Sequence, residues 1–163
     1  DAATQWDVIA VDAYRPPYIP FHLTTREFFQ LVHDHLDEDG VLAINVGRTA
    51  TNYDLVDAMA ATVGSIFPSV HLVDEPGPPD ALGNTMLIAT VQPTTLADFQ
   101  TSAATIDDAL GSEMTRLLGT ALSVAHTSDA STLAAYAETV FTDDHAPIEW
   151  LVHGIVLDYV TAN

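Results

Sequence analysis

The stretch WDVIAVDAYRPP, residues 6–17, is an apolar run that ends in an acid and is soon followed by two prolines. Residues 7–13 are rich in β-favouring side chains, which predicts a strand buried on both faces in a parallel sheet. Open α/β sheets place reacting groups just beyond the carboxyl ends of their strands. Asp12 is therefore the first candidate for catalysis.

The segments that follow predict a helix and a second strand. After a proline-rich loop, Thr24 and Glu27 form a capping-box pattern that begins a helix. Its apolar residues recur at helical spacing up to an acidic turn at 37–40. Residues 41–46 then predict an apolar strand, which we expect Gly47 to end.

The rest of the chain predicts more helices and an antiparallel pair of strands. Residues 53–67 repeat apolar side chains at helical spacing. Residues 70–73 and 85–91 are β-rich runs joined by a loop of prolines and glycines, which favours an antiparallel pair. Three further helices are predicted at residues 106–124, 132–140 and 147–160.

These elements indicate one α/β domain over residues 1–163, a partial Rossmann-like doubly wound sheet whose last strands are antiparallel. We expect the sheet in residues 1–92 and helical cover in residues 93–163. This order leaves the strand at 7–13 at an open edge of the sheet. Because a strand follows Asp1 almost at once, the chain reads as a fragment, a processed product or a trimmed piece of a longer protein. Upstream strands or a second copy of the chain would cover that edge.

Acidic residues dominate the charge of the chain. The chain has four arginines and no lysine but 23 aspartates and glutamates, so its formal net charge is -19. Such a charge repels nucleic acid and anionic lipid, so neither is an expected partner. Replacement of lysine by acids is typical of proteins that work in concentrated salt, where screening removes most self-repulsion. An acidic patch for a basic ligand is the alternative.

The sequence lacks cysteine, long apolar runs and a recognisable signal peptide. Without cysteine it can form no disulfide, thiolate nucleophile or cysteine-zinc site. No apolar run approaches the roughly 18 residues that a membrane span needs. No signal peptide is visible either.

Three blocks of the sequence resemble spermidine synthase-like proteins: DVIAVDAYRPPYIPFHLTTREFF at 7–29, DGVLAINV at 39–46 and TDDHAPIEW at 142–150. The resemblance implies the second half of a methyltransferase-type fold that uses S-adenosylmethionine, a seven-stranded sheet whose last strand is antiparallel. It is closest to the branch that is often joined to membrane spans. We therefore expect a cytoplasmic location, as a soluble domain with or without upstream spans.

The resemblance also implies roles for single residues. In the family, the acid at Asp12 removes a proton from the amine that displaces a propyl group from a sulfonium. Burial by Tyr14, Tyr18 and Phe21 would raise the basicity of Asp12. A carboxylate that only caps the following loop is the alternative. Asn45 either faces the nucleoside or amine or caps its own turn. The remaining candidate binding residues are Tyr14, Arg15, Pro16, Tyr18 and His22.

The chain departs from the family pattern in ways that bear on its substrates. Arg15 stands where polyamine-binding members carry a second acid, which disfavours a diamine and could select an anionic acceptor. A family tyrosine is replaced by the Gly-Pro-Pro segment at 77–79. The glycine-rich turn that holds the nucleoside is not in this sequence. S-adenosylmethionine or its decarboxylated form is therefore expected as a substrate that this segment does not bind tightly.

Three functions stay open: a spermidine synthase-like transferase acting on a small-molecule amine or another nucleophile, a methyltransferase with the same cofactor, and a non-catalytic module. The module would associate with a second copy through the strand at 7–13. Metal chemistry is not expected. His33 and His35 are two apart on a helix and point to different sides. The cluster at 143–149 suits the cap and first turn of the last helix.

Overall fold

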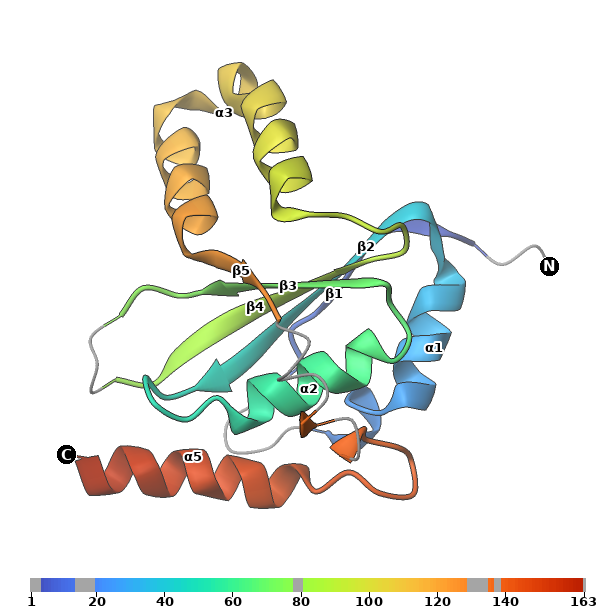
Figure 1. Cartoon of the computed structure of the whole chain (residues 1–163), viewed down its shortest axis with the longest axis vertical. Helices are drawn as coiled ribbons and strands as arrows, with labels where there is room; N and C mark the ends of the chain where they lie inside the picture. The colour runs from blue at the N-terminus through green and yellow to red at the C-terminus, as the bar shows by residue number, and fades with distance from the viewer. Residues whose placement is uncertain (1–3, 14–19, 78–80, 129–134, 137–138, 163) are drawn as a thin grey trace.

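The computed structural model describes residues 4–13, 20–77, 81–128, 135–136 and 139–162 (Figure 1). Within them one sheet has the strand order β1-β2-β4-β3-β5. The strands are β1 Trp6–Val11, β2 Leu36–Arg48, β3 Ser69–Asp74, β4 Gly83–Thr90 and β5 Ala125–Thr127. β1 is parallel to β2, whereas β4 runs antiparallel to both of its neighbours, β2 and β3. The predicted α/β fold class and the antiparallel pair of strands are confirmed.

Helices cover both faces of this sheet (Figure 1). They are η1 Phe21–Leu23, α1 Arg26–His35, α2 Asp54–Gly64, α3 Leu96–Val124 and α5 Ile148–Ala162. α1 and α2 pack on one face, and α5 packs against α2. α3 lies on the opposite face, where it contacts β3 and β5.

The two faces of β2 have different environments. Leu42, Ile44 and Val46 are fully buried in the main core with α2. Ala43 and Asn45 alternate with them and are only partly buried. Because successive side chains of a strand point to opposite faces, Asn45 is presented on the face that α3 covers incompletely.

β2 is longer at both ends than the sequence predicts. The acidic segment at 37–40, expected as a turn, lies inside the strand, and the β1–β2 register shifts between Trp6 and Val8. The segment therefore makes an irregularity in the ladder and does not reverse the chain. Gly47 does not end the strand either, because β2 remains paired with β4 through Arg48.

The start of α1 also differs from its prediction. Thr25 is the N-cap, and its Oγ1 accepts a hydrogen bond from the Phe28 backbone N–H at 3.3 Å. Glu27 accepts instead from the backbone N–H of Asp143 at 3.1 Å. The expected capping box of Thr24 and Glu27 is therefore wrong.

α3 begins earlier than predicted and is followed by a strand that the sequence did not indicate. Thr95 and Asp98 form a reciprocal capping box at its start. The helix is kinked at Gly111, whose φ of 76° lies in the left-handed region that glycine adopts without a steric cost. β5 then pairs with β3 in antiparallel orientation. The predicted helix at 132–140 falls largely outside the described residues.

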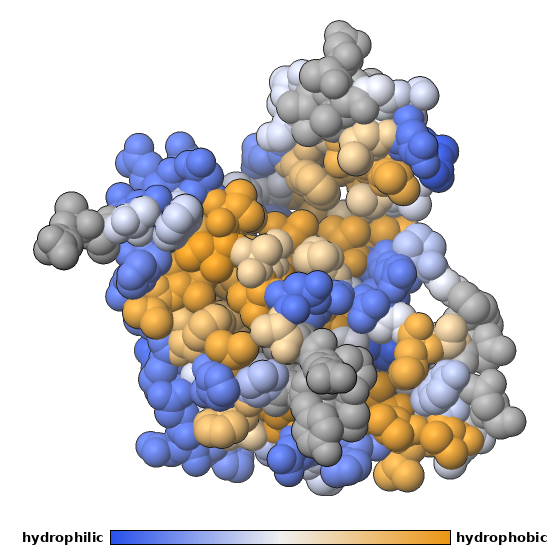
Figure 2. All heavy atoms as spheres, turned by 180° about the vertical axis from the view of Figure 1, so that it is seen from behind, coloured by the Kyte–Doolittle hydropathy of each residue, from blue (hydrophilic) through white to orange (hydrophobic). Residues whose placement is uncertain are grey.

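β1 lies at an edge of the sheet, as predicted, and pairs only with β2 within the described part of the chain. Trp6 and Val8 are 54% and 60% exposed, so the prediction that this strand is buried on both faces is wrong. Figure 2 shows apolar surface extending over the back of the molecule below α3. Of the helices in the described ranges, none has the length and apolar character needed to cross a membrane.

Candidate functional site

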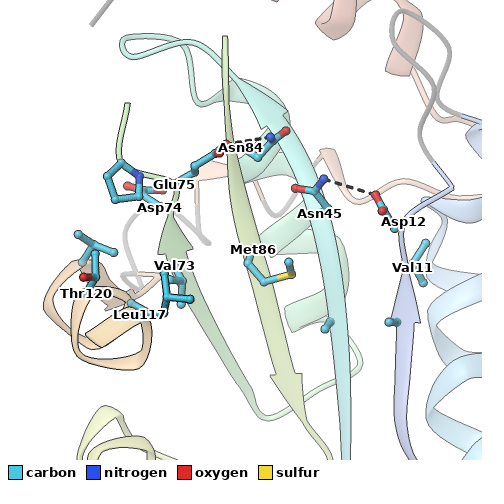
Figure 3. A pocket seen from close by; sticks show the side chains of 15 residues that line it. Val11, Asp12, Asn45, Val73, Asp74, Glu75, Asn84, Met86, Leu117 and Thr120 are labelled. Carbon is cyan, nitrogen blue, oxygen red and sulfur yellow. Dashed lines mark hydrogen bonds between the residues drawn. The ribbon is translucent and has the colours of Figure 1, made fainter. Parts of the chain in front are cut away.

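A cavity of about 520 Å³ lies where β1, β2 and β3 end (Figure 3). The sheet forms one side of it, through residues such as Ala43, Val73 and Met86. The last turns of α3 form another side, through Leu117, Thr120, Ala121 and Val124. The carboxyl ends of parallel strands are where open α/β sheets bind their ligands.

Asp12 and Asn45 meet in this cavity. Asp12 follows the last residue of β1, and the register pairs Val11 with Ile44, so that Asp12 lies beside Asn45, which is inside β2. The Asn45 Nδ2 donates to Asp12 Oδ1 across 3.4 Å. Asp12 is exposed and accepts from no other described residue. Two residues predicted from separate strands are thus brought together, and the second carboxylate oxygen of Asp12 accepts no hydrogen bond from a described residue.

A second acid and amide form a similar pair on β3 and β4. The Asn84 Nδ2 donates to Glu75 Oε2 at 3.0 Å, and the Glu75 backbone N–H donates to the Asn84 carbonyl at 2.8 Å. Figure 3 shows Glu75 and Asp12 on opposite sides of the cavity, with the two asparagines between them. Sequence reasoning missed this pair, because its only signal was an acid at the start of a loop of prolines and glycines.

Asp74 also lines the cavity but belongs to a buried network. Arg48, only 8% exposed, places its Nε 3.5 Å from Asp74 Oδ1 and donates to Thr85 Oγ1 at 2.9 Å. The hydroxyls of Thr85 and Tyr53 donate to Asp74 at 2.6 and 3.0 Å. Burial, together with the hydrogen bond to the Asp74 carboxylate, raises the pKa of Tyr53. The charge of Asp74 is thus compensated within the fold.

The other predicted site residues do not join this pair. Tyr14, Arg15, Pro16 and Tyr18 lie outside the described residues. His22 is exposed in η1, where its ring packs edge-on against Phe21 with centroids 5.6 Å apart. Neither His22 nor Phe21 lines the cavity, so the expected contribution of each to the site of Asp12 finds no support in the geometry.

The histidines and acids considered for metal binding have other contacts. In the ranges that the structure describes, no three side chains of histidine, aspartate or glutamate are grouped to hold a metal ion. His33 packs against the ring of Phe67, with centroids 5.2 Å apart. Asp143 Oδ1 accepts from the Thr25 hydroxyl at 2.7 Å. This contact ties the segment before α5 to the start of α1.

Comparisons with known proteins show which family this chain is similar to. The model of the spermine/spermidine synthase domain matches residues 1–100. A probable polyamine aminopropyl transferase of Bifidobacterium longum is 36% identical over 64 residues, which are 39% of this chain and 14% of that protein. A polyamine aminopropyltransferase of Vibrio vulnificus is 36% identical over 73 residues, 45% of this chain and 24% of that protein.

A solved structure shares the fold. The crystal structure of a probable spermidine synthase from Corynebacterium glutamicum superposes with a TM-score of 0.58 at 23% sequence identity. The match covers 86% of this chain and 48% of that one. The chain therefore spans about half of this solved structure, and smaller shares of the two curated relatives.

Proposed function

Because the chain belongs to the spermine/spermidine synthase domain family, we propose that it forms the acceptor side of an aminopropyltransferase active site, with Asp12 as the general base. The observation that carries the proposal is the position of Asp12. Its carboxylate follows a parallel strand, lines a cavity and is held through one oxygen by Asn45. This position suits a group that must meet both a cationic amine and the carbon that the amine attacks.

The proposed reaction needs a base, because a protonated amine has no lone pair with which to attack. The nitrogen attacks the propyl carbon that is bonded to the sulfonium of decarboxylated S-adenosylmethionine. The carbon–nitrogen bond forms as the carbon–sulfur bond breaks, and the sulfur leaves as a neutral thioether. Asp12 takes the proton that the nitrogen loses, through the oxygen that Asn45 does not hold.

The lining of the cavity supports a cationic, partly apolar guest. Val73, Met86 and Leu117 supply apolar contacts beside the acids. Among the described residues that line it, no arginine, lysine or histidine occurs. We assign the nucleoside to parts of the site beyond this segment, because the sequence carries no glycine-rich turn for it.

The test is the release of methylthioadenosine by the complete protein from decarboxylated S-adenosylmethionine and an amine. We expect Asp12→Asn to lower kcat by roughly 10²–10⁴, the usual contribution of a general base. Asp7→Asn is the matched control, since Asp7 is an exposed acid on the same strand. It should leave kcat unchanged.

Each outcome separates the candidate functions. Full activity of Asp12→Asn would overturn the assignment of the base. A methylated acceptor formed from S-adenosylmethionine, with no thioether release from the decarboxylated form, would identify a methyltransferase. No binding of either nucleoside by calorimetry would favour the non-catalytic module.

A further inference from the structure

α3 is attached to the rest of the molecule mainly at its two ends. Figure 1 shows the helix bent back on itself above the sheet, and the kink at Gly111 separates its two halves. Its main contacts are with β3 and β5. Of the α3 side chains that the structure describes, Ala103 alone is buried. Because so little apolar surface holds it, α3 is a segment that can move at a low cost in free energy.

The first end of α3 is fixed to the sheet by several hydrogen bonds. Ser69 Oγ on β3 accepts from the Thr94 backbone N–H at 2.9 Å and donates to the Thr94 carbonyl at 3.1 Å. The Thr94 hydroxyl also lies 2.9 Å from the hydroxyl of Thr90 on β4. The same hydroxyl lies 2.9 Å from His71 Nε2. This end is therefore suited to be the fixed point of any movement of α3.

The second end of α3 is held by much less. It leads directly into β5, whose three residues pair only with β3 in the described part of the chain. The Thr127 hydroxyl on β5 lies 3.4 Å from His71 Nδ1 on β3. A three-residue edge strand opens more easily than the longer strands of the same sheet. This weaker end is the one that carries Leu117 and Val124 to the wall of the cavity.

One buried imidazole thus lies next to both ends of α3. His71 is 5% exposed, and its two ring nitrogens face the hydroxyls of Thr94 and Thr127. Among the described residues, Asp98 of α3 is the charged group that acts on it, but that carboxylate already accepts two hydrogen bonds from Thr95. The register partners of His71 on β4 and β5 carry no charge. A proton on this ring is therefore poorly compensated, and burial lowers the pKa of His71.

From these features we propose that β5 and the second half of α3 form a pH-sensitive wall of the cavity, with His71 as its latch. When the ring is neutral, it contacts Thr127 and the wall stays closed. When the ring is protonated, β5 leaves β3, so that water reaches the charged imidazolium and the wall withdraws from the sheet. This device concerns the shape of the cavity for any ligand, so it does not depend on the aminopropyl transfer proposed above.

The direction and size of the effect follow from the two protonation equilibria. The open form hydrates His71 and gives it a pKa near the ordinary 6.5, whereas burial lowers the pKa in the closed form. The closed form is therefore favoured above that pH and loses stability relative to the open form as the pH falls through it. If the closed form stays neutral, the equilibrium constant for opening rises about tenfold between about pH 7.5 and 5.5.

The test is hydrogen–deuterium exchange of the complete protein at about pH 7.5 and 5.5, corrected for the intrinsic exchange rate at each pH. We expect the protection of residues 117–127 to fall about tenfold at the lower pH, while α2 keeps its protection. His71→Gln should lose this pH dependence. His126→Gln is the matched control and should retain it, because His126 is an exposed histidine on β5 itself.

A reversible crosslink tests the latch without a change to His71. Val73→Cys and Ala125→Cys place cysteines on register partners of β3 and β5, in a chain that has no other cysteine. The oxidised form should show no pH dependence in residues 117–127, and the reduced form should show it. The proposal is overturned if the oxidised form keeps the pH dependence, if α2 loses protection to the same extent, or if residues 117–127 do not respond to pH.

Discussion

Replacement of Arg48 tests whether the network behind the cavity stabilises the fold. Arg48 is 8% exposed, and its guanidinium donates a hydrogen bond to Thr85, lies 3.5 Å from the Asp74 carboxylate and sits 4.7 Å from the centre of the Tyr53 ring. Arg48→Met keeps an apolar stem but leaves Asp74 without its cation. It also removes the bonds to the carbonyls of Thr49 and Glu75.

Breaking a buried ion pair from one side costs about 3–5 kcal/mol. The Asp74 side chain retains 24% of its exposure, so we expect the lower end of that range. A loss of about 3 kcal/mol is a large share of the roughly 5–15 kcal/mol that stabilises a domain. It corresponds to a fall in melting temperature of about 10 °C for a chain of this size.

The assay is urea unfolding followed by circular dichroism, with Arg116→Met as the control. Arg116 is exposed on α3, and its loss makes the net charge more negative by the same single unit. Any general effect of charge repulsion is therefore shared by both variants. A difference between them below about 1 kcal/mol, within the range of an exposed pair, would refute the stabilising role of the network.

Two further predictions concern pH and salt. Burial lowers the pKa of His71 below its ordinary value of 6.5, so as the pH falls the unfolded chain binds a proton before the folded chain does. The free energy of unfolding that neutral His71 contributes is therefore present above its ordinary pKa and is lost as the pH falls through the lowered pKa of the folded chain. We expect His71→Gln to flatten the pH dependence of the urea midpoint between about pH 7 and 5. Parallel curves for the two proteins would contradict this. With a net charge of -19, the melting temperature should rise from dilute buffer to molar KCl, and an unchanged value would argue against salt adaptation.

The sequence predicted the elements that carry apolar side chains in a regular pattern. The strand at 7–13 and the helix at 53–67 were recognisable because β1 and α2 carry their own hydrophobic signal. It also placed Asp12 just beyond the end of β1, whereas Asn45 was singled out through the resemblance. The roles of these two side chains in catalysis and binding were inferred from the resemblance, and these roles stay predictions.

Features that depend on distant backbone pairing could not be predicted in the same way. β5, Ala125–Thr127, contains one alanine and two polar residues, and it is a strand only because β3 offers it a partner. The acidic segment at 37–40 has the composition of a turn, and it forms a bulge without ladder partners among the described residues. The strand continues because the residues on both sides of the bulge pair with β1. The contacts of Glu75 and Arg48 could not be predicted, because they depend on the packing of β3 and β4 beside β2.

The open edge of β1 has a consequence for how the cavity responds to whatever lies beside it. The strand has six residues, and Asp12 is the residue that follows them. An extended segment that paired with this edge would hold β1 in place through backbone hydrogen bonds. It would thereby set the position of the carboxylate at the strand's end. Pairing at the open edge of β1 and the position of the Asp12 carboxylate are therefore coupled through the backbone of this one strand.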